Sequence, residues 1–142
     1  MRILILNGPN LNLLGKREPE IYGNTDFQEF YEELAAVYDD VAQFHYEQNN
    51  VEGELINILQ AADADFDAVV LNAGGYTHTS VALADCIAAI ATPVVEVHIS
   101  QPAAREEYRR HSLIAGKCIA SISGFGLDSY RLAVEGIISK ES

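Results

Sequence analysis

A chain of 142 residues, of which 49% are hydrophobic, is long enough to bury one core and too apolar to be a disordered protein. Its net charge of −12, with only nine lysines and arginines, argues against nucleic acid or an anionic membrane as a partner. No apolar run approaches the roughly 20 residues that span a bilayer, and the run at residues 3–6 is too short for a secretory signal. We therefore expect a cytoplasmic protein.

The few cations are unevenly distributed along the chain. Two lie within residues 7–23, at Lys16 and Arg17, and four of the nine lie close together in the sequence, at Arg105, Arg109, Arg110 and Lys117. An acidic protein that binds an anion must use local positive charge, so this distribution indicates where a small anionic substrate could bind. Scattered solubilising charge remains an adequate interpretation of Arg105, Arg110 and Lys117.

Alternating apolar and polar segments predict one domain, residues 1–142, built from five strand–helix units. This alternation favours a parallel sheet with helices on both faces and right-handed crossovers. The expected fold class is α/β, a flavodoxin-like doubly wound sheet with strand order 2-1-3-4-5. We predict strands over residues 2–6, 41–47, 68–71, 94–98 and 118–122, helices from residue 25 and over 52–64, 80–91 and 127–140, and a short helix near 103–109.

Two helix starts can be predicted from capping residues. The first helix is predicted to begin at Thr25, because Thr25-Asp-Phe-Gln28 has the form of a capping box. An apolar stripe, which includes Val37, then recurs at helical spacing and indicates a core-facing surface rather than a cofactor site. The third helix is predicted to be capped by Thr79 or Thr77.

The segment between the first strand and the first helix, residues 7–23, is far longer than the usual connection. It leaves the carboxyl end of a strand, where open α/β sheets bind ligands. It carries Asn10 among leucines, followed by Arg17 and Tyr22. From spacing alone, an ordinary surface loop and a functional loop are equally good interpretations.

Glu96 and His98 are unexpected within the apolar strand Val94-Val-Glu-Val-His98. Residues two apart on a strand share a face, so the carboxylate could orient the imidazole, although a buried pair without function is an alternative. The carboxyl ends of the first, third and fourth strands lie side by side in the expected order. Polar residues follow all three strands: Asn10, Arg17 and Tyr22 after the first, Asn72 and His78 after the third, and Ser100 and Arg109 after the fourth.

Several reaction classes lack support in the sequence. There is no GxSxG elbow, no P-loop and no GxGxxG after the first strand. The histidines show no metal-ligand spacing, and Cys86 and Cys118 have none either, so we expect free thiols, no metal and no cofactor. A phenol, an arginine, an imidazole and several amide donors remain. They suit proton abstraction beside a carbonyl with acid-assisted loss of a leaving group.

Four ordered stretches closely resemble the signature of type II 3-dehydroquinate dehydratase, and the likeness covers nearly the whole chain. They are Asn7–Gly23, Glu52-Gly-Glu-Leu55, Asn72–Ser80, and Glu96–Ser100 followed by Ala104–Arg109. The resemblance implies a lyase of the shikimate pathway, which supplies aromatic amino acid biosynthesis. It would reversibly dehydrate 3-dehydroquinate to 3-dehydroshikimate through an enolate-like intermediate.

The resemblance also implies a role for individual residues. Tyr22 is expected to be the base, with Arg17 favouring its phenolate, and Asn10 to hold a water or donate to the enolate oxygen. His98 is expected to protonate the departing hydroxyl and Glu96 to orient it. The implied substrate-binding residues are Asn72 and the backbone of Ile99 and Ser100 as carboxylate and hydroxyl anchors, His78 and Arg109 at the ring hydroxyls, and Asp85 from a neighbouring subunit.

Family members assemble trimers into dodecamers, so a homododecamer is expected. The chain departs from the family pattern at Val51, Ala73–Gly75 and Gln101–Ala103, which bears on loops and subunit contacts. Two other functions remain open. One is a flavodoxin-like binding or receiver module, although Asn7 and Asn72 stand where a receiver needs acidic residues. The other is a catalytically inactive relative, which the complete set of expected site residues disfavours.

Overall fold

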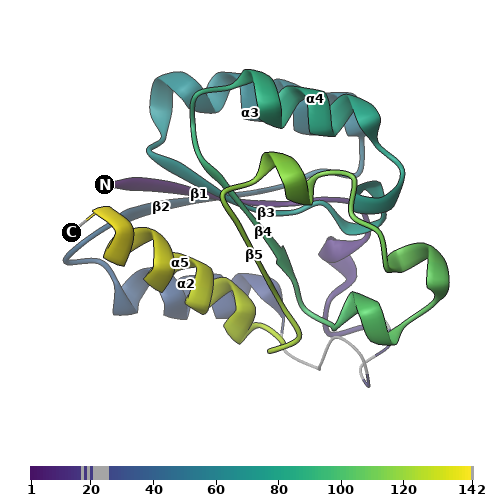
Figure 1. Ribbon diagram of the computed structural model, residues 1–142. Coiled ribbons are helices and arrows are strands. Elements are labelled where there is room, and N and C mark those ends of the chain that lie inside the picture. The colour runs from purple at the N-terminus through teal and green to yellow at the C-terminus, as the bar shows by residue number, and fades with distance from the viewer. Residues whose placement is uncertain (17, 19, 21–25, 142) are drawn as a thin grey trace.

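The computed structural model describes residues 1–16, 18, 20 and 26–141. Five parallel strands form one sheet in the order β2-β1-β3-β4-β5 (Figure 1). This confirms the α/β fold class and the flavodoxin-like order predicted from the sequence. The strands are β1 (Arg2–Asn7), β2 (Gln43–Gln48), β3 (Ala68–Asn72), β4 (Val94–His98) and β5 (Ala120–Ser123).

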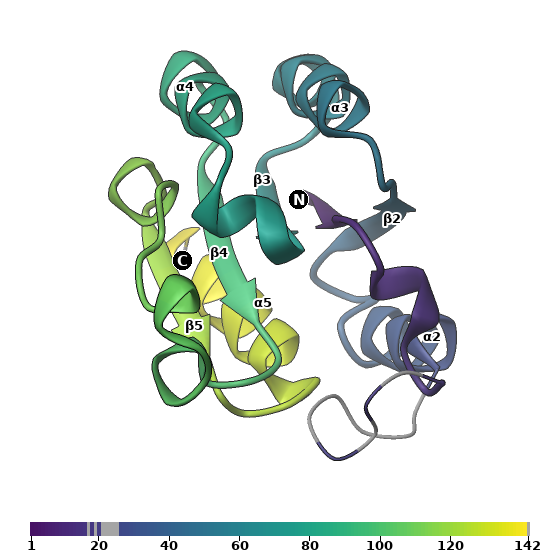
Figure 2. The same ribbon diagram turned by 90° about the vertical axis from the view of Figure 1, so that its right-hand side faces the viewer.

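Helices cover both faces of this sheet. The helices α3 (Glu52–Asp65) and α4 (Val81–Ala89) lie on one face, and α2 (Phe27–Val37) and α5 (Asp128–Glu141) lie on the other (Figures 1 and 2). The central strands are therefore mostly apolar, as is usual for parallel strands buried on both faces, and their polar residues are concentrated toward their carboxyl ends. Every residue of β3 is buried, whereas the edge strands β2 and β5 are only partly covered.

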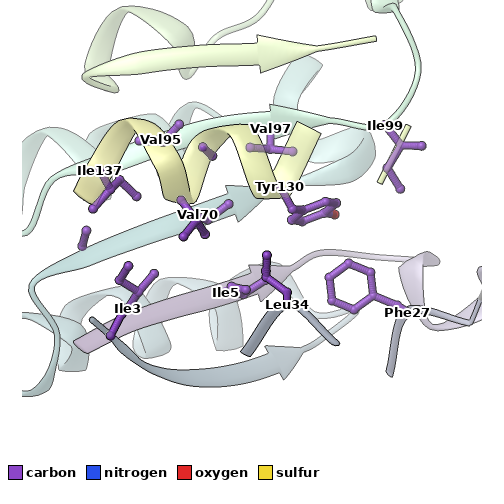
Figure 3. Close-up of a cluster of buried hydrophobic side chains, with 14 of the residues drawn as sticks. Ile3, Ile5, Phe27, Leu34, Val70, Val95, Val97, Ile99, Tyr130 and Ile137 are labelled. Atoms are coloured by element: carbon purple, nitrogen blue, oxygen red, sulfur yellow. The ribbon is translucent and has the colours of Figure 1, made fainter. Parts of the chain in front are cut away.

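The sheet separates two hydrophobic clusters. Beneath α2 and α5, Ile3, Ile5 and Val70 pack against Phe27 and Tyr130, whose rings meet edge to face with centroids 4.9 Å apart (Figure 3). Beneath α3 and α4, the alternate residues of the same strands join leucines of the helices. Because successive strand residues point to opposite faces, one apolar strand supplies both clusters.

Both predicted helix caps need correction. The Asp26 carboxylate accepts a hydrogen bond from the Gln28 N–H at 3.1 Å, so Asp26 caps α2 instead of Thr25, which lies outside the described residues. The Ser80 hydroxyl accepts from the Leu83 N–H at 2.9 Å and caps α4 in place of Thr77 or Thr79. In each case a neighbouring residue with an equally suitable side chain has the required extended backbone.

Two other details differ from the sequence-based expectations. The short helix near residues 103–109 is two 3₁₀ turns, Pro102–Ala104 and Glu107–Arg109, which connect β4 to the rest of the chain. Val37 is exposed at the end of α2 and does not belong to the apolar stripe. Tyr38, the next residue, still packs against the core, so Val37 lies to the side of the apolar stripe and the stripe itself reaches the end of the helix.

Cys86 and Cys118 are free thiols, as expected. Burial raises the pKa of Cys118 to about 12, and the negative charge of Glu96 adds to that effect. A thiol of this kind stays protonated near neutral pH and is a poor nucleophile. Among the described residues, no helix combines the length and the apolar character needed to cross a bilayer.

Candidate active site

A cleft opens at the carboxyl ends of β1, β3 and β4, the edge of the sheet that Figure 2 presents. In the strand order 2-1-3-4-5 this is the topological switch point, where neighbouring connections diverge to opposite faces. Seven of the residues proposed from the sequence line the cleft: Asn10, Asn72, His78, His98, Ile99, Ser100 and Arg109. They come from segments far apart in the sequence, which the three adjacent strand ends bring together.

The centre of the site is the pair formed by Glu96 and His98 on β4. The His98 Nε2–H donates to Glu96 Oε2 at 2.7 Å. An ionised carboxylate can only accept a hydrogen bond, so Nε2 carries the hydrogen and Nδ1 is the ring nitrogen left for a ligand. Glu96 is 2% exposed, whereas His98 lines the cleft. The carboxylate therefore supports the imidazole from inside the protein.

Glu96 receives two further hydrogen bonds, which the sequence analysis did not foresee. The Ser121 hydroxyl donates to Oε1 at 2.7 Å, and the Ser112 hydroxyl donates to Oε2 at 2.8 Å. Burial by itself would raise the pKa of Glu96, but the hydrogen bonds from His98, Ser121 and Ser112 outweigh burial and hold this pKa below its usual range. The carboxylate is thus ionised at neutral pH although it is buried.

A second imidazole lies beside the first. The rings of His78 and His98 stack at 6.4 Å between centroids, with 20° between their planes. The His78 Nδ1–H donates to the carbonyl oxygen of His111 at 2.8 Å, which leaves Nε2 for a ligand. His78 ends the 3₁₀ turn Gly74–His78 that follows β3. The two strand ends thus present two aligned rings on one side of the cleft.

Asn72, at the end of β3, is held by a buried polar network. Its Nδ2–H donates to the Tyr130 hydroxyl at 2.8 Å, and that hydroxyl donates to Asn7 Oδ1 at 2.7 Å. The Asn72 Oδ1 accepts from the Gly74 N–H at 3.1 Å. Gly74 has φ of 59°, a conformation that favours glycine. These contacts set the orientation of the Asn72 amide, which lines the cleft.

Replacing Tyr130 with phenylalanine is expected to destabilise the protein by about 1–3 kcal/mol, because two buried amide groups would lose their shared partner. Tyr130 is fully buried, and burial raises its pKa, so the hydroxyl stays protonated and can both donate and accept. Urea unfolding measures the loss. The matched control is Tyr38→Phe, which removes an exposed hydrogen bond to Glu135 and should cost less. Equal losses in the two variants would contradict this account of the network.

Asn10 contributes from the segment after β1. Its backbone has φ of 70°, and its N–H donates to Asn50 Oδ1 at 3.0 Å. Asparagine tolerates this left-handed conformation better than most residues. Asn50 in turn accepts from the Gln48 side chain, which also donates to the Gly8 carbonyl oxygen. The loop that carries Asn10 is therefore fixed to the end of β2.

Two arginines also line the cleft, and the sequence predicted only one of them as a site residue. Arg109 donates to Glu106 at 2.8 Å and lies over the Tyr108 ring. Arg105 also lines the cleft, and its Nη1–H donates to the Ser100 hydroxyl at 3.3 Å. Solubilising charge is therefore an incorrect interpretation of Arg105. Its place within the stretch Ala104–Arg109 was the signal that could have indicated its position.

Four of the proposed residues are not among the described residues that line this cleft, and one of them is Glu96, which contacts the cleft through His98. Arg17 and Tyr22 lie outside the described residues. Asp85 is exposed on α4 and does not line the cleft. Among the described residues, no group of three or more histidines, cysteines and carboxylates could hold a metal ion.

The arrangement of the described residues suits acid-assisted chemistry on a small anion. An imidazole backed by an ionised carboxylate can hold a proton at Nδ1 and release it to an oxygen atom. The two arginines give the cleft positive charge in a chain whose net charge is −12. The amide of Asn72 and the end of β4 supply polar contacts that can orient a ligand.

A family model described as "Dehydroquinase class II" matches residues 1–138. A protein named 3-dehydroquinate dehydratase from an Exiguobacterium species is 52% identical over 138 residues, which cover 97% of this chain and 94% of that protein.

Two solved structures are also similar. The type II dehydroquinase of Butyrivibrio crossotus aligns with a TM-score of 0.93 and 37% identity, over 98% of this chain and 97% of that one. The type II dehydroquinase of Propionibacterium acnes aligns with a TM-score of 0.92 and 36% identity, over 97% and 96% of the two chains.

Proposed function

The chain belongs to the class II dehydroquinase family, and from this premise we propose that it is a hydro-lyase that reversibly dehydrates 3-dehydroquinate to 3-dehydroshikimate. The observation that carries the proposal is the Glu96–His98 pair, 2.7 Å between nitrogen and oxygen, whose imidazole lines the switch-point cleft together with two arginines. This site offers a proton donor and positive charge, which elimination of water from an anionic substrate requires. The reaction places the enzyme in the shikimate pathway.

We assign the acid step to His98. With Nε2–H bound to Glu96, the imidazole can carry a second proton on Nδ1. The Nδ1 proton passes to the departing hydroxyl group, which leaves as water. The carbon–oxygen bond breaks, and the electron pair of the enolate forms the new carbon–carbon double bond. Glu96 orients the ring and does not need to exchange a proton itself.

We assign the base step to Tyr22, on the strength of the sequence. A tyrosine with the usual pKa of about 10 is only about 0.1% ionised at pH 7. A nearby cation lowers such a pKa by ~1–3 units, and Arg17 is five residues away. The phenolate would take a proton from the carbon beside the ketone. Asn10 would donate to the enolate oxygen or hold a water there, an interaction worth ~3–4 kcal/mol.

The remaining cleft residues are proposed to bind the substrate. Asn72, with Ile99 and Ser100 at the end of β4, would anchor its carboxylate and a hydroxyl group. His78 and Arg109 would bind the ring hydroxyls. The hydrogen bond that Arg105 donates to the Ser100 side chain holds a cation beside these anchors.

The proposal extends to the assembly and setting of the enzyme. Asp85 is exposed on α4 and away from the cleft of its own chain. It would reach the substrate only if a neighbouring subunit brought it there, within trimers that form a homododecamer. We propose a single catalytic domain, residues 1–142, acting in the cytoplasm without a cofactor.

Turnover is expected to survive both a chelator and borohydride. The chain has three lysines, Lys16, Lys117 and Lys140, and none lies in an apolar strand where desolvation could lower its pKa for imine formation. The measurement is the rate after EDTA treatment, and again after borohydride is added with substrate. Loss of activity to EDTA, or covalent trapping on a lysine, would contradict a mechanism without metal or imine.

The experiment that tests the function is direct. The pure protein is mixed with 3-dehydroquinate, and the ultraviolet absorbance of the conjugated enone is followed. We expect the absorbance to rise with a rate proportional to enzyme concentration. A receiver or flavin-binding module, or a catalytically inactive relative, would leave the absorbance at the level without protein.

A further inference from the structure

The carboxylate of Glu96 lies where an unsupported charge would be unfavourable. Its side chain is 2% exposed, and the residues on either side of it in β4, Val95 and Val97, are buried and apolar. Burial favours the neutral form of a carboxyl group, which would itself carry a hydrogen and compete with the ring N–H of His98. Something other than His98 must therefore help to keep Glu96 ionised.

Two hydroxyl groups are placed to do this. The pairing of β4 with β5 sets Ser121 directly opposite Glu96, so the two side chains are cross-strand neighbours. Ser121 donates to Oε1, whereas Ser112 and His98 both donate to Oε2. The three donors occupy both oxygen atoms and leave the carboxylate one orientation, with Oε2 toward the imidazole.

We propose that Ser121 and Ser112 are positioning residues of this active site, which hold the Glu96 carboxylate ionised and directed at His98. The inference deepens the proposed function and rests on it for its kinetic consequences. Neither serine lines the cleft, so neither is proposed to touch the substrate. Both act through Glu96, and their loss should change the protonation of Glu96 before it changes binding.

Other titratable groups also surround this pair. Cys118 lies close enough for the charge of Glu96 to act on its thiol, but it stays neutral in the working range. His78 stacks on His98, and Arg105 and Arg109 share the cleft. These groups remain in place when a serine hydroxyl is removed. A comparison between serine variants therefore isolates the hydrogen bond from their charges.

Ser121→Ala is the cleaner variant, because Ser112 also accepts a hydrogen bond from the Ala115 N–H and so supports a turn. Removing the donor should raise the pKa of Glu96, so the acidic limb of the pH–rate profile should move to higher pH by about one unit. The turnover number should fall near that limb while KM changes little. Ser121→Thr keeps the hydroxyl and should restore the wild-type profile.

The matched control is Ser123→Ala on the same strand, whose hydroxyl donates to Gln101 instead of Glu96. A second readout needs no turnover: the titration of the Glu96 side-chain carboxyl followed by carbon-13 NMR. The NMR titration still tests the serines if the protein fails to convert 3-dehydroquinate, so the two proposals can fail separately. The expected result is an upward shift in Ser121→Ala and none in Ser121→Thr or Ser123→Ala. An unchanged Glu96 titration in Ser121→Ala, or an equal shift in Ser123→Ala, would overturn the proposal.

Discussion

Replacing Tyr22 with phenylalanine is expected to lower turnover by roughly 10²–10⁴-fold, the usual contribution of a general base. The substitution keeps the aromatic ring and removes only the oxygen that would take the proton. Binding of 3-dehydroquinate should change much less, because a group that acts in the transition state contributes mainly to the turnover number. Steady-state rates of enone formation separate the two effects. Near-full turnover in this variant would show that another group is the base.

The role of Arg17 follows from the same pair of residues. Arg17→Ala should also slow turnover, and the pH dependence that reports the phenol should move up toward that of free tyrosine. The double variant should be scarcely slower than Tyr22→Phe, because Arg17 has no phenol left to activate. A slower Arg17→Ala enzyme with an unchanged pH profile would instead assign Arg17 to substrate binding.

Replacing His98 with glutamine is expected to lower turnover by roughly 10²–10⁴-fold as well, since the departing hydroxyl would lose its proton donor. The 2.7 Å hydrogen bond to Glu96 is the structural reason, because it fixes the ring and leaves Nδ1 to hold the proton. Glu96 must be ionised for this, and its pKa lies below the usual range. Activity that depends on the ionised Glu96 carboxylate is therefore present above the lowered pKa of Glu96 and is lost as the pH falls through that pKa. The measurement is the pH–rate profile of both proteins.

A matched control for His98→Gln is His45→Gln. His45 is on the edge strand β2, contacts the Phe66 ring and lies away from the cleft. This variant should keep near wild-type turnover. If the two substitutions reduced turnover equally, the loss would reflect impaired folding and not the acid step. Urea unfolding of both variants would then show a lower stability than that of the wild type.

Much of the fold could be predicted because its signals are periodic. The buried strands at residues 68–71 and 94–98 are short apolar runs in the sequence. Their alternation with helical patterns indicated the fold class and favoured the strand order that the sheet adopts. Helix caps were harder. Thr25, Asp26, Thr79 and Ser80 are all good capping residues in sequence, and only backbone geometry selects Asp26 and Ser80.

The candidate site also has residues that the sequence predicts and residues that it does not. Glu96 and His98 could be found because charged groups in an apolar strand are conspicuous, and their spacing placed them on one face. Ser121, Ser112 and Tyr130 could not be found. Their contribution depends on the register between β4 and β5 and on the packing of α5, which no local pattern in the sequence reveals. Residues with hydroxyl groups occur throughout the chain, so the residue type alone does not indicate which of them support the site.

In the proposed reaction a base outside β4 removes the proton, and the His98–Glu96 pair then completes the loss of water. Incubation of His98→Gln with 3-dehydroquinate in deuterium oxide, followed by proton NMR, tests this directly. We expect one hydrogen beside the ketone to exchange for deuterium faster than in a sample without protein, while almost no enone forms. Tyr22→Phe should show neither process. Loss of exchange in His98→Gln to the level without protein would contradict the account, because it would show that His98 is needed to remove the proton.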